Sequence, residues 1–357
     1  MDFMSTKQAA EKWSISHRRV LSLCSEGRID SVQRGGNMWL IPNDTPKPVD
    51  GRSLRFSNNA TVSLKPFVKW AGGKGQLLKD IRKMYPVELG KSITKYAEPF
   101  VGGGAVLFDI LSTYTLSEIY ISDINAELIN TYLMIRDDVS DLVKLLSRMQ
   151  DEYVPMGQED RKAYYYKKRF QFNELKTKVS NVRNLESAAL FIFLNRTCFN
   201  GLYRVNRKGL FNVPIGSYKK PVICDAENLR NVSKALKNVI IVCGDYKKSA
   251  DFIDESTFVY FDPPYRPITD TASFTSYTED VFDDNSQREL ASFMKRMVNR
   301  KAKVVVSNSD PKNSNTEDDF FEKLYAGHRI VRVEANRMIN CNSEARGRIS
   351  ELLISNY

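Results

Sequence analysis

The sequence has little histidine and cysteine and lacks a long apolar run. Two of its 357 residues are histidines and five are cysteines, and no two cysteines form a C-x-x-C pair. This scarcity argues against a zinc centre, a disulfide framework or a histidine-based catalytic triad, so we expect no metal. No stretch of eighteen apolar residues and no signal-peptide pattern is present, so we expect a cytoplasmic protein without membrane contact.

Positive charge is concentrated in the middle of the chain. Residues 161–221 contain fourteen Lys or Arg and two acidic residues, a net charge of +12, whereas the whole chain carries +10. A basic surface confined to one part of a chain is typical of a face that binds a polyanion, most simply a nucleic-acid backbone. For the helix expected at 161–178, a solvated surface is the alternative to phosphate contact.

An apolar run, Phe258–Phe261, leads directly into Asp262, Pro263, Pro264 and Tyr265. The run is typical of a strand buried on both faces, and the prolines end it because they cannot donate to a sheet. Ligands of open α/β sheets bind beyond such strand ends. The Asp262 carboxylate and the Pro263 carbonyl can accept the two hydrogens of an exocyclic amino group, and Tyr265 can stack on its ring. We therefore predict a site for an aminated planar ring.

A glycine turn, an acid and a lysine predict a second ligand beside this one. The sequence E-P-F-V-G-G-G at 98–104 lies between an expected strand and an expected helix, and Asp123 follows 21 positions after Gly102. That spacing is typical of an acid that binds ribose hydroxyls. Lys74 supplies a cation for a carboxylate, and the P-loop spacing is absent. The elements expected here are strands at 92–97, 119–123, 239–242 and 258–261, and a helix at 105–111.

The first 45 residues read as a separate small module. Helices are expected at 5–11 and 17–25, the second ended by Gly27, and strands at 29–34 and 38–41 flank a turn at 35–37. This order resembles the winged helix-turn-helix of excisionase-like and MerR-like DNA-binding domains. A plain packing module is the alternative. Residues 46–64 read as a linker.

The main part of the chain resembles the Dam family of DNA adenine-N6 methyltransferases, the α group of amino-methyltransferases. The motifs that carry the resemblance are K-W-A-G-G-K (69–74), E-P-F-V-G-G-G (98–104), S-D-I-N (122–125), F-L-N-R-T-C-F-N-G-L-Y-R-V-N (193–206), G-L-F-N-V-P-I-G (209–216), D-P-P-Y (262–265) and G-R-I-S-E-L-L (347–353). The resemblance covers about residues 65–357. It implies a doubly wound, Rossmann-like α/β methyltransferase domain (65–150 and 222–357) with an inserted helical and hairpin recognition domain (151–221).

The resemblance also implies S-adenosylmethionine as the methyl donor. Residues that would bind it are Trp70, Lys74, Phe100, Gly102, Asp123, Asp245, Tyr246 and Asp262. Lys74 would reach the carboxylate of the donor and Asp123 its ribose. Asp262, Pro263 and Tyr265 would be catalytic, because they would hold an adenine flipped out of the duplex in line with the methyl group.

The basic middle of the chain would then read double-stranded DNA. Residues expected to contact DNA are Lys69, Arg196, Phe199, Asn200, Leu202, Arg204, Asn206 and Pro214, most of them in a hairpin expected at 195–214. Arg204 can pair with O6 and N7 of guanine, and Phe199 can fill the gap left by the flipped base. Lys69 and Arg204 match residues that contact the guanines of GATC in the family. GATC is therefore the expected target, while Leu210, where some relatives have an acid, leaves longer GAT-containing palindromes open.

The complete prediction is a bacterial or phage DNA methyltransferase, monomeric, either alone or with a restriction endonuclease for the same site. Two alternatives are a catalytically inert DNA-binding regulator and a methyltransferase for RNA or protein glutamine. The latter enzymes more often carry Asn at the position of Asp262. Intact Lys74, Asp123 and Asp262 argue against the inert regulator.

Overall fold

The computed structural model describes residues 3–13, 16–25, 29, 32–35, 38–43, 45, 64–178, 183–266, 282–336 and 348–357. The chain divides into two units, Met1–Thr61 and Val62–Tyr357. Each unit has its own buried apolar cluster, so each is described by itself.

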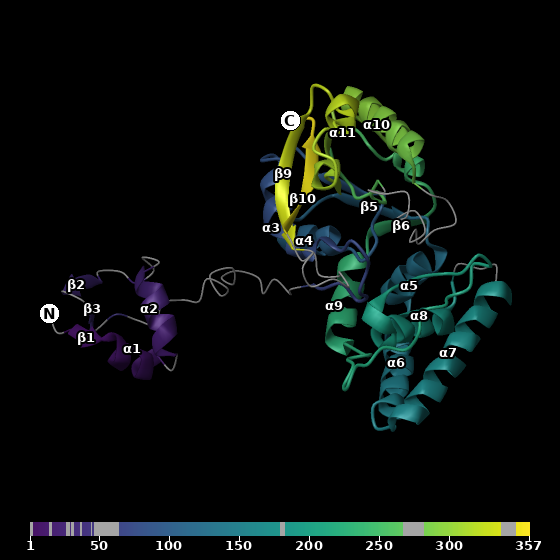
Figure 1. Cartoon of the computed structure of the whole chain (residues 1–357), viewed down its shortest axis with the longest axis horizontal. Coiled ribbons are helices and arrows are strands. Elements are labelled where there is room, and N and C mark those ends of the chain that lie inside the picture. The colour runs from purple at the N-terminus through teal and green to yellow at the C-terminus, as the bar shows by residue number, and fades with distance from the viewer. Residues whose placement is uncertain are drawn as a thin grey trace. The chain divides into compact units, whose positions relative to one another are not determined.

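The first unit combines two short helices with a small antiparallel sheet (Figure 1). Its elements are β1 (Phe3–Ser5), α1 (Thr6–Trp13), α2 (His17–Ser25), β2 (Gln33–Gly35) and β3 (Met38–Pro42). Both expected helices are present, whereas β1 was not expected and pairs with β3 through Met4 and Ile41. The first hairpin strand is shorter than expected. The expected helix end at Gly27 and most of the linker lie outside the described residues.

The second unit is built on a seven-stranded sheet in the order β6-β5-β4-β7-β8-β10-β9. The strands are β4 (Lys95–Glu98), β5 (Glu118–Asp123), β6 (Val239–Cys243), β7 (Thr257–Phe261), β8 (Lys303–Ser309), β9 (Arg329–Asn336) and β10 (Arg348–Ser355). The first five in this spatial order are parallel, and β10 runs antiparallel to both β8 and β9. The expected mixed α/β fold with a mostly parallel central sheet is therefore present.

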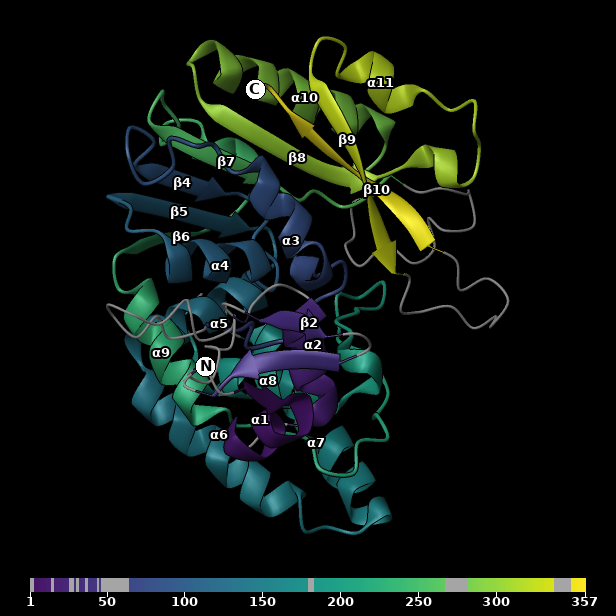
Figure 2. The same cartoon turned by 90° about the vertical axis from the view of Figure 1, so that its left-hand side faces the viewer.

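Helices pack on both faces of this sheet. The helices described in this unit are α3 (Leu78–Ile81), α4 (Ala105–Thr113), α5 (Ala126–Asp137), α6 (Val139–Tyr153), α7 (Gln158–Lys178), α8 (Leu185–Thr197), α9 (Ala226–Leu236), α10 (Asp284–Asn299) and α11 (Phe320–Leu324). Alternate residues of β7 enter opposite cores: Phe258 and Tyr260 join the core of α4 and α5, whereas Val259 and Phe261 join that of α10. This explains why the strand reads as a continuous apolar run. Figure 2 shows α10 and α4 on opposite sides of the strands.

The spatial order of the strands reverses between β4 and β7. From β4 the chain continues outward to β5 and β6, and from β7 it continues in the other direction to β8. The loops that follow these two neighbouring strands, at residues 99–104 and 262–266, therefore leave the same edge of the sheet. In open α/β sheets such a switch point is where ligands bind.

The segment between β5 and β6 contains α5 to α9, and α8 contacts α5, α6 and α7 (Figures 1 and 2). The prediction of a hairpin at 195–214 was wrong at its start, because residues 195–197 form the last turn of α8. This helix is begun by Asn184, whose side chain accepts from the Ser187 N–H, and its apolar run continues to Thr197. In the turn that follows, isolated bridges join Cys198 to Ile215 and Val205 to Phe211.

No helix in the described ranges combines the length and the apolar character that a membrane crossing requires.

Candidate active site and DNA-reading turn

Asp262 follows β7 directly, at the switch point of the sheet. The ammonium of Lys74 lies 2.8 Å from its Oδ1 atom, and the Ser307 hydroxyl on β8 donates to the same oxygen at 2.8 Å. Lys74 is 4% exposed and also donates to the Gly72 carbonyl at 2.7 Å. Asp262 retains 20% exposure, so the carboxylate is held by its neighbours and still reachable by a ligand.

The segment after Asp262 is fixed by contacts from three elements. The Tyr265 hydroxyl donates to Glu351 on β10, and the Lys74 ammonium lies 4.6 Å from the centre of the Tyr265 ring. The Gln287 side chain on α10 donates to the Pro264 carbonyl at 3.2 Å. Burial, followed by the negative charges of Asp262 and Glu351, raises the pKa of Tyr265 well above its usual range. The phenol therefore stays protonated and can serve as a donor.

Two acids, the buried Glu98 and the partly buried Glu351, belong to this cluster although they were predicted only as motif residues. Glu98, at the end of β4, is 2% exposed and accepts from the Tyr96 hydroxyl at 2.7 Å. Burial raises the pKa of Glu98 well above its usual range, and the charge of Asp262 raises it further. Burial likewise raises the pKa of Glu351. The available signal for Glu98 was an acid before proline at the end of an apolar strand, the same pattern as at Asp262.

The glycine turn after β4 is shaped by Trp70 and Asp123. Gly102 has a φ of +47°, and a Cβ atom there would lie 2.7 Å from Cδ1 of Trp70, so only glycine fits. The Gly102 N–H donates to Asp123 at 3.0 Å, and the Asn125 N–H donates to its other oxygen at 2.9 Å. Burial raises the pKa of Asp123, and these backbone donors oppose the shift. Asp123 thus links the end of β5 to the glycine turn.

Two aromatic rings pair on the neighbouring strand ends. Phe100 after β4 and Tyr246 after β6 are stacked, with ring centres 5.3 Å apart and planes inclined by 28°. Asp245 accepts from the Lys247 N–H at 2.8 Å and so begins the short helix η4 (Tyr246–Ser249). The strand ends therefore bring three features to one edge of the sheet: the Phe100–Tyr246 stack, the hydrogen-bonded carboxylate of Asp123 and the Lys74–Asp262 ion pair.

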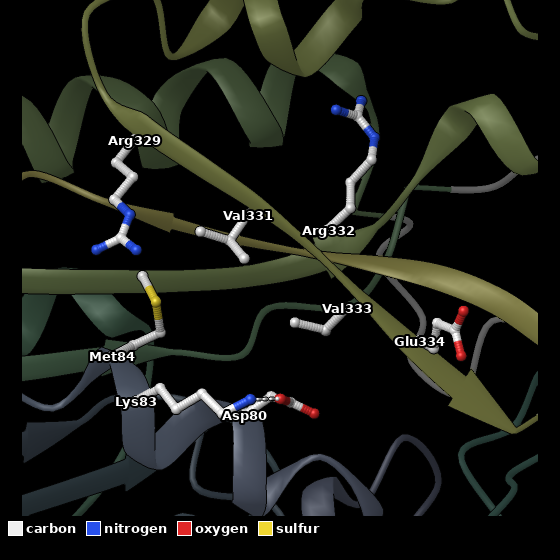
Figure 3. Close-up of a pocket in the computed structure, with 8 residues that line it drawn as sticks. All are labelled: Asp80, Lys83, Met84, Arg329, Val331, Arg332, Val333 and Glu334. Atoms are coloured by element: carbon white, nitrogen blue, oxygen red, sulfur yellow. Dashed lines mark hydrogen bonds and ion pairs between the residues drawn. The ribbon is translucent and has the colours of Figure 1, made fainter.

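Two cavities lie near this part of the molecule, one of them away from the Asp262 cluster. A cavity of about 480 Å³ lies between the short helix η2 (Arg82–Met84) and β9, and includes the Asp80–Lys83 ion pair (Figure 3). It shares no lining residue with the Asp262 cluster. A smaller one, of about 170 Å³, is lined by Tyr265 and Glu351 together with Ser309, Asn313, Ser314, Ile349 and Ser350. Over the ranges that the structure describes, no three His, Cys, Asp or Glu residues are grouped as metal ligands.

Several residues expected to contact DNA are exposed on the turn after α8. Phe199, at the start of η3 (Phe199–Gly201), is 52% exposed, and its N–H donates to the Pro214 carbonyl at 2.9 Å. Asn200 is exposed and has a φ of +54°. Arg204 is also exposed, and its Nε atom donates to Asn212 at 2.8 Å. The turn thus presents an aromatic ring and a guanidinium group to solvent.

Lys69 lies against this turn although it is far away in the sequence. Asn195, which is 3% exposed, accepts from the Lys69 N–H at 2.8 Å and donates to the carbonyls of Lys69 at 2.8 Å and Gly201 at 2.9 Å. The Lys69 ammonium donates to the Tyr218 hydroxyl at 3.1 Å. The structure therefore places Lys69 beside the segment that carries Phe199 and Asn200.

Three other residues of the expected DNA set contact mainly the protein itself. Arg196 donates to the Phe67 carbonyl at 2.8 and 3.2 Å, and burial lowers its pKa. Asn206 is exposed, but its side chain accepts the N–H groups of Lys208 and Leu210 in its own turn. Leu202 is partly buried against the main core. We interpret all three as residues that shape the turn.

The fold is that of an α/β protein whose mostly parallel sheet carries an acid, a glycine turn and an aromatic pair at its switch point, where ligands of such sheets bind. Residues 70–339 match the D12 class of N6 adenine-specific DNA methyltransferases, and the chain belongs to this family. The resemblance of the main part of the chain to DNA adenine-N6 methyltransferases is thereby confirmed. The protein is an adenine-specific DNA methyltransferase, which excludes the RNA and protein-glutamine alternatives and argues against an inert regulator.

The chain is similar to curated relatives over most of their lengths. It is 50% identical to Type II methyltransferase M.MjaIII of Methanocaldococcus jannaschii over 298 residues, 83% of this chain and 100% of the relative. It is 36% identical to Type II methyltransferase M1.LlaDCHI of Lactococcus lactis subsp. cremoris, over 83% of this chain and 96% of the relative. It is 33% identical to the DNA adenine methylase of Haemophilus influenzae, over 85% and 97%.

Proposed function

We propose that the enzyme transfers a methyl group from S-adenosylmethionine to N6 of an adenine flipped out of duplex DNA, within GATC. The observation that carries this proposal is the Lys74–Asp262 pair at the switch point, with Tyr265 beside it. In this proposal Lys74 would bind the carboxylate of the methyl donor and Asp262 would accept from the amino group of adenine, and the 2.8 Å between them supports two ligands that meet at this point.

The residues present fit S-adenosylmethionine. Lys74 would bind its carboxylate, Asp123 its ribose hydroxyls, and Phe100 with Tyr246 its adenine ring, while Trp70, Gly102 and Asp245 would complete the site. The Phe100–Tyr246 stack and the glycine turn without Cβ atoms support this assignment, because both suit a flat ring close to backbone. When bound, the donor supplies an electrophilic methyl group on a sulfonium.

The chemical contribution of the protein is to orient the adenine. The Asp262 carboxylate and the Pro263 carbonyl accept the two amino hydrogens, which directs the nitrogen lone pair toward the methyl group. Tyr265 stacks on the flipped ring, and its bond to Glu351 fixes the plane of its own ring. Ser307 holds Asp262 from the neighbouring strand, β8.

Target recognition is assigned to the turn after α8. Arg204 and Lys69 would read the guanines of GATC, and Phe199 would fill the space left by the flipped adenine. Their exposure supports this assignment, as does the Asn212 contact that orients the Arg204 guanidinium. Asn200 and Pro214 would contribute through the backbone and shape of the turn.

The remaining assignments concern domain organisation and context. We assign residues 151–221 to DNA recognition, 65–150 and 222–357 to catalysis, and the first unit to a winged helix-turn-helix that contacts DNA. Two relatives are named type II methyltransferases, which supports a restriction–modification system with an endonuclease for the same site. The enzyme is proposed to act as a cytoplasmic monomer.

Methylation mapping tests the function directly. DNA from cells that express the chain is sequenced for N6-methyladenine, beside DNA from cells that express the Asp262→Ala variant. We expect methylated adenine in GATC with the wild type only. Methylation confined to another sequence would contradict the GATC assignment, and equal signals from both proteins would contradict the role of Asp262.

A further inference from the structure

We propose that Tyr203 is a positioning residue that couples the methyl-donor site to the DNA-reading turn, the segment after α8 at residues 198–216. The methyl donor and the target DNA would then bind cooperatively. The proposal rests on the proposed function, in which Trp70 contacts the donor and Arg204 reads a guanine. Tyr203 itself contacts neither ligand in this scheme. It acts through its position between Trp70 and Arg204, which do contact the two ligands.

The first half of the connection is a direct contact between two rings. The rings of Tyr203 and Trp70 are stacked, with centres 5.7 Å apart and planes inclined by 23°. Phe191 on α8 supports both, at 5.5 Å from Tyr203 and 6.2 Å from Trp70. Tyr203 is 8% exposed, so its ring is enclosed and cannot move without moving its neighbours.

Trp70 carries the contact to the donor side. Its Cδ1 and Nε1 atoms face the glycine turn so closely that a Cβ atom on Gly102 would lie 2.7 and 3.0 Å from them. Gly102 in turn donates to Asp123. Any ligand that orders Asp123 or the glycine turn therefore also restricts the indole ring.

Tyr203 carries the contact to the DNA side through the chain itself. It lies directly between Leu202 and Arg204, so the position of its ring sets where the Arg204 backbone lies. Its hydroxyl donates to Glu127 on α5 at 3.1 Å and accepts from Lys176 on α7 at 3.0 Å.

The Glu127–Lys176 pair fixes the far end of the Tyr203 ring. Lys176 and Glu127 lie 2.8 Å apart. Burial, and then the charge of Glu127, raises the pKa of Tyr203, so the phenol keeps its proton and remains a donor. One side chain thus joins α5, α7, the Trp70 segment and the DNA-reading turn.

Cooperative binding follows because the two sites share this contact. A donor that orders Trp70 lowers the cost of ordering Tyr203 and Arg204 on DNA, and target DNA does the same for the donor. Thermodynamic linkage requires that the methyl donor change the affinity for DNA by the same factor by which DNA changes the affinity for the methyl donor.

The experiment uses the full chain and S-adenosylhomocysteine, the product, as a non-reacting probe of the donor site. Its Kd is measured without DNA, with a GATC duplex, and with a duplex changed at one guanine. For the wild type we expect GATC to tighten binding about fivefold or more, and the changed duplex to tighten it less. The reciprocal titration of DNA with and without the probe should give the same factor.

Variants separate the ring contact from simple loss of packing. Tyr203→Leu should bring the coupling factor close to one, whereas Tyr203→Phe keeps the stack on Trp70 and should retain most of it. The matched control is Tyr153→Leu on α6, since Tyr153 is 2% exposed and packs on Tyr164 and Phe193. It should lower thermal stability and leave the coupling factor unchanged.

Each outcome decides the proposal. A wild type without coupling, or Tyr203→Leu with wild-type coupling, overturns it. If Tyr203→Leu does not fold, Tyr203→Met takes its place under the same criterion. A wild type that does not bind the probe, or does not methylate GATC, refutes the proposed function and with it this inference; a wild type that does both while coupling is absent refutes the inference alone.

Discussion

The ammonium of Lys74 lies 2.8 Å from Oδ1 of Asp262, so the cation assigned to the donor is paired with the acid assigned to the adenine. One oxygen of Asp262 thus already has two hydrogen-bond donors, the ammonium of Lys74 and the hydroxyl of Ser307. In the proposed function the carboxylate of S-adenosylmethionine attracts Lys74, so that Ser307 alone still donates to this oxygen and the amino group can take the place of Lys74. With these proposed roles, we expect S-adenosylmethionine to bind before the adenine enters.

The first prediction concerns Asp262. We expect Asp262→Ala to abolish methyl transfer while the protein still folds, because the amino group loses its acceptor at the reacting atom. The measurement is single-turnover transfer of labelled methyl groups, with thermal melting as the test of folding. Ser307→Ala, which removes one of the groups that hold Asp262, should reduce the rate by much less. Near wild-type turnover in Asp262→Ala would disprove its role.

The second prediction concerns base readout by Arg204. Arg204→Ala should reduce discrimination at one guanine by about 1–3 kcal/mol, because a bidentate contact to that base is lost. The affinity for S-adenosylmethionine in the absence of DNA should not change. The comparison is kcat/KM on GATC and on duplexes changed at one position. Arg207→Ala, an exposed arginine of the same turn, is the control, and a uniform loss on all sequences would mark Arg204 as a phosphate contact.

The third prediction concerns pH and the buried Glu98. Folding raises the pKa of Glu98 above its ordinary value of 4.5, so the folded state holds the proton more tightly. The contribution of protonated Glu98 to the free energy of unfolding is complete below pH 4.5. It is lost as the pH rises toward the pKa of Glu98 in the folded state. Glu98→Gln can still accept from Tyr96 and does not titrate.

We therefore expect Glu98→Gln to gain stability relative to the wild type as pH rises from 4.5, by up to about 1.4 kcal/mol per pH unit. Denaturant unfolding of both proteins across this pH range measures the difference. A constant difference at all pH values would show that Glu98 has the same pKa in both states.

The fourth prediction concerns the first unit. Deletion of residues 1–60 should leave the methylated sequence unchanged, because the residues assigned to base readout lie in the second unit. Affinity for duplex DNA should fall, and its dependence on salt should become shallower, since fewer counterions are released. Binding is measured against salt concentration for both chains.

A point-mutation control keeps the first unit in place. Arg18 and Arg34 are exposed on it, so the double change Arg18→Ser and Arg34→Ser in the full chain should reproduce part of the salt effect. Coinciding salt slopes for all three proteins would instead indicate that this unit packs against, or binds, something other than DNA.

The sequence was sufficient for four strands of the main sheet, β4 to β7, and for the family, because both depend on local patterns, whereas β8, β9 and β10 were not predicted. The apolar run before Asp262 and the glycines before α4 are visible without any knowledge of pairing. Glu351 was predicted only as part of a motif, because it reaches Tyr265 through the antiparallel pairing of β10 with β8, across 86 positions of sequence. Arg196, which was assigned to DNA, donates to the carbonyl groups of Pro66 and Phe67, 130 and 129 positions away in the sequence, and no local pattern could show these contacts.

The position of β10 has a consequence for how the enzyme is made. This strand pairs with β8 on one side and β9 on the other, and it is the last strand of the described chain to be synthesised. A nascent polypeptide that stops before residue 348 can form the parallel strands and the Lys74–Asp262 pair, but it leaves a gap in the sheet. Such a polypeptide also lacks the acid that holds Tyr265. Translation of the described chain therefore completes the sheet, and adds the acid that holds Tyr265, only with its last strand.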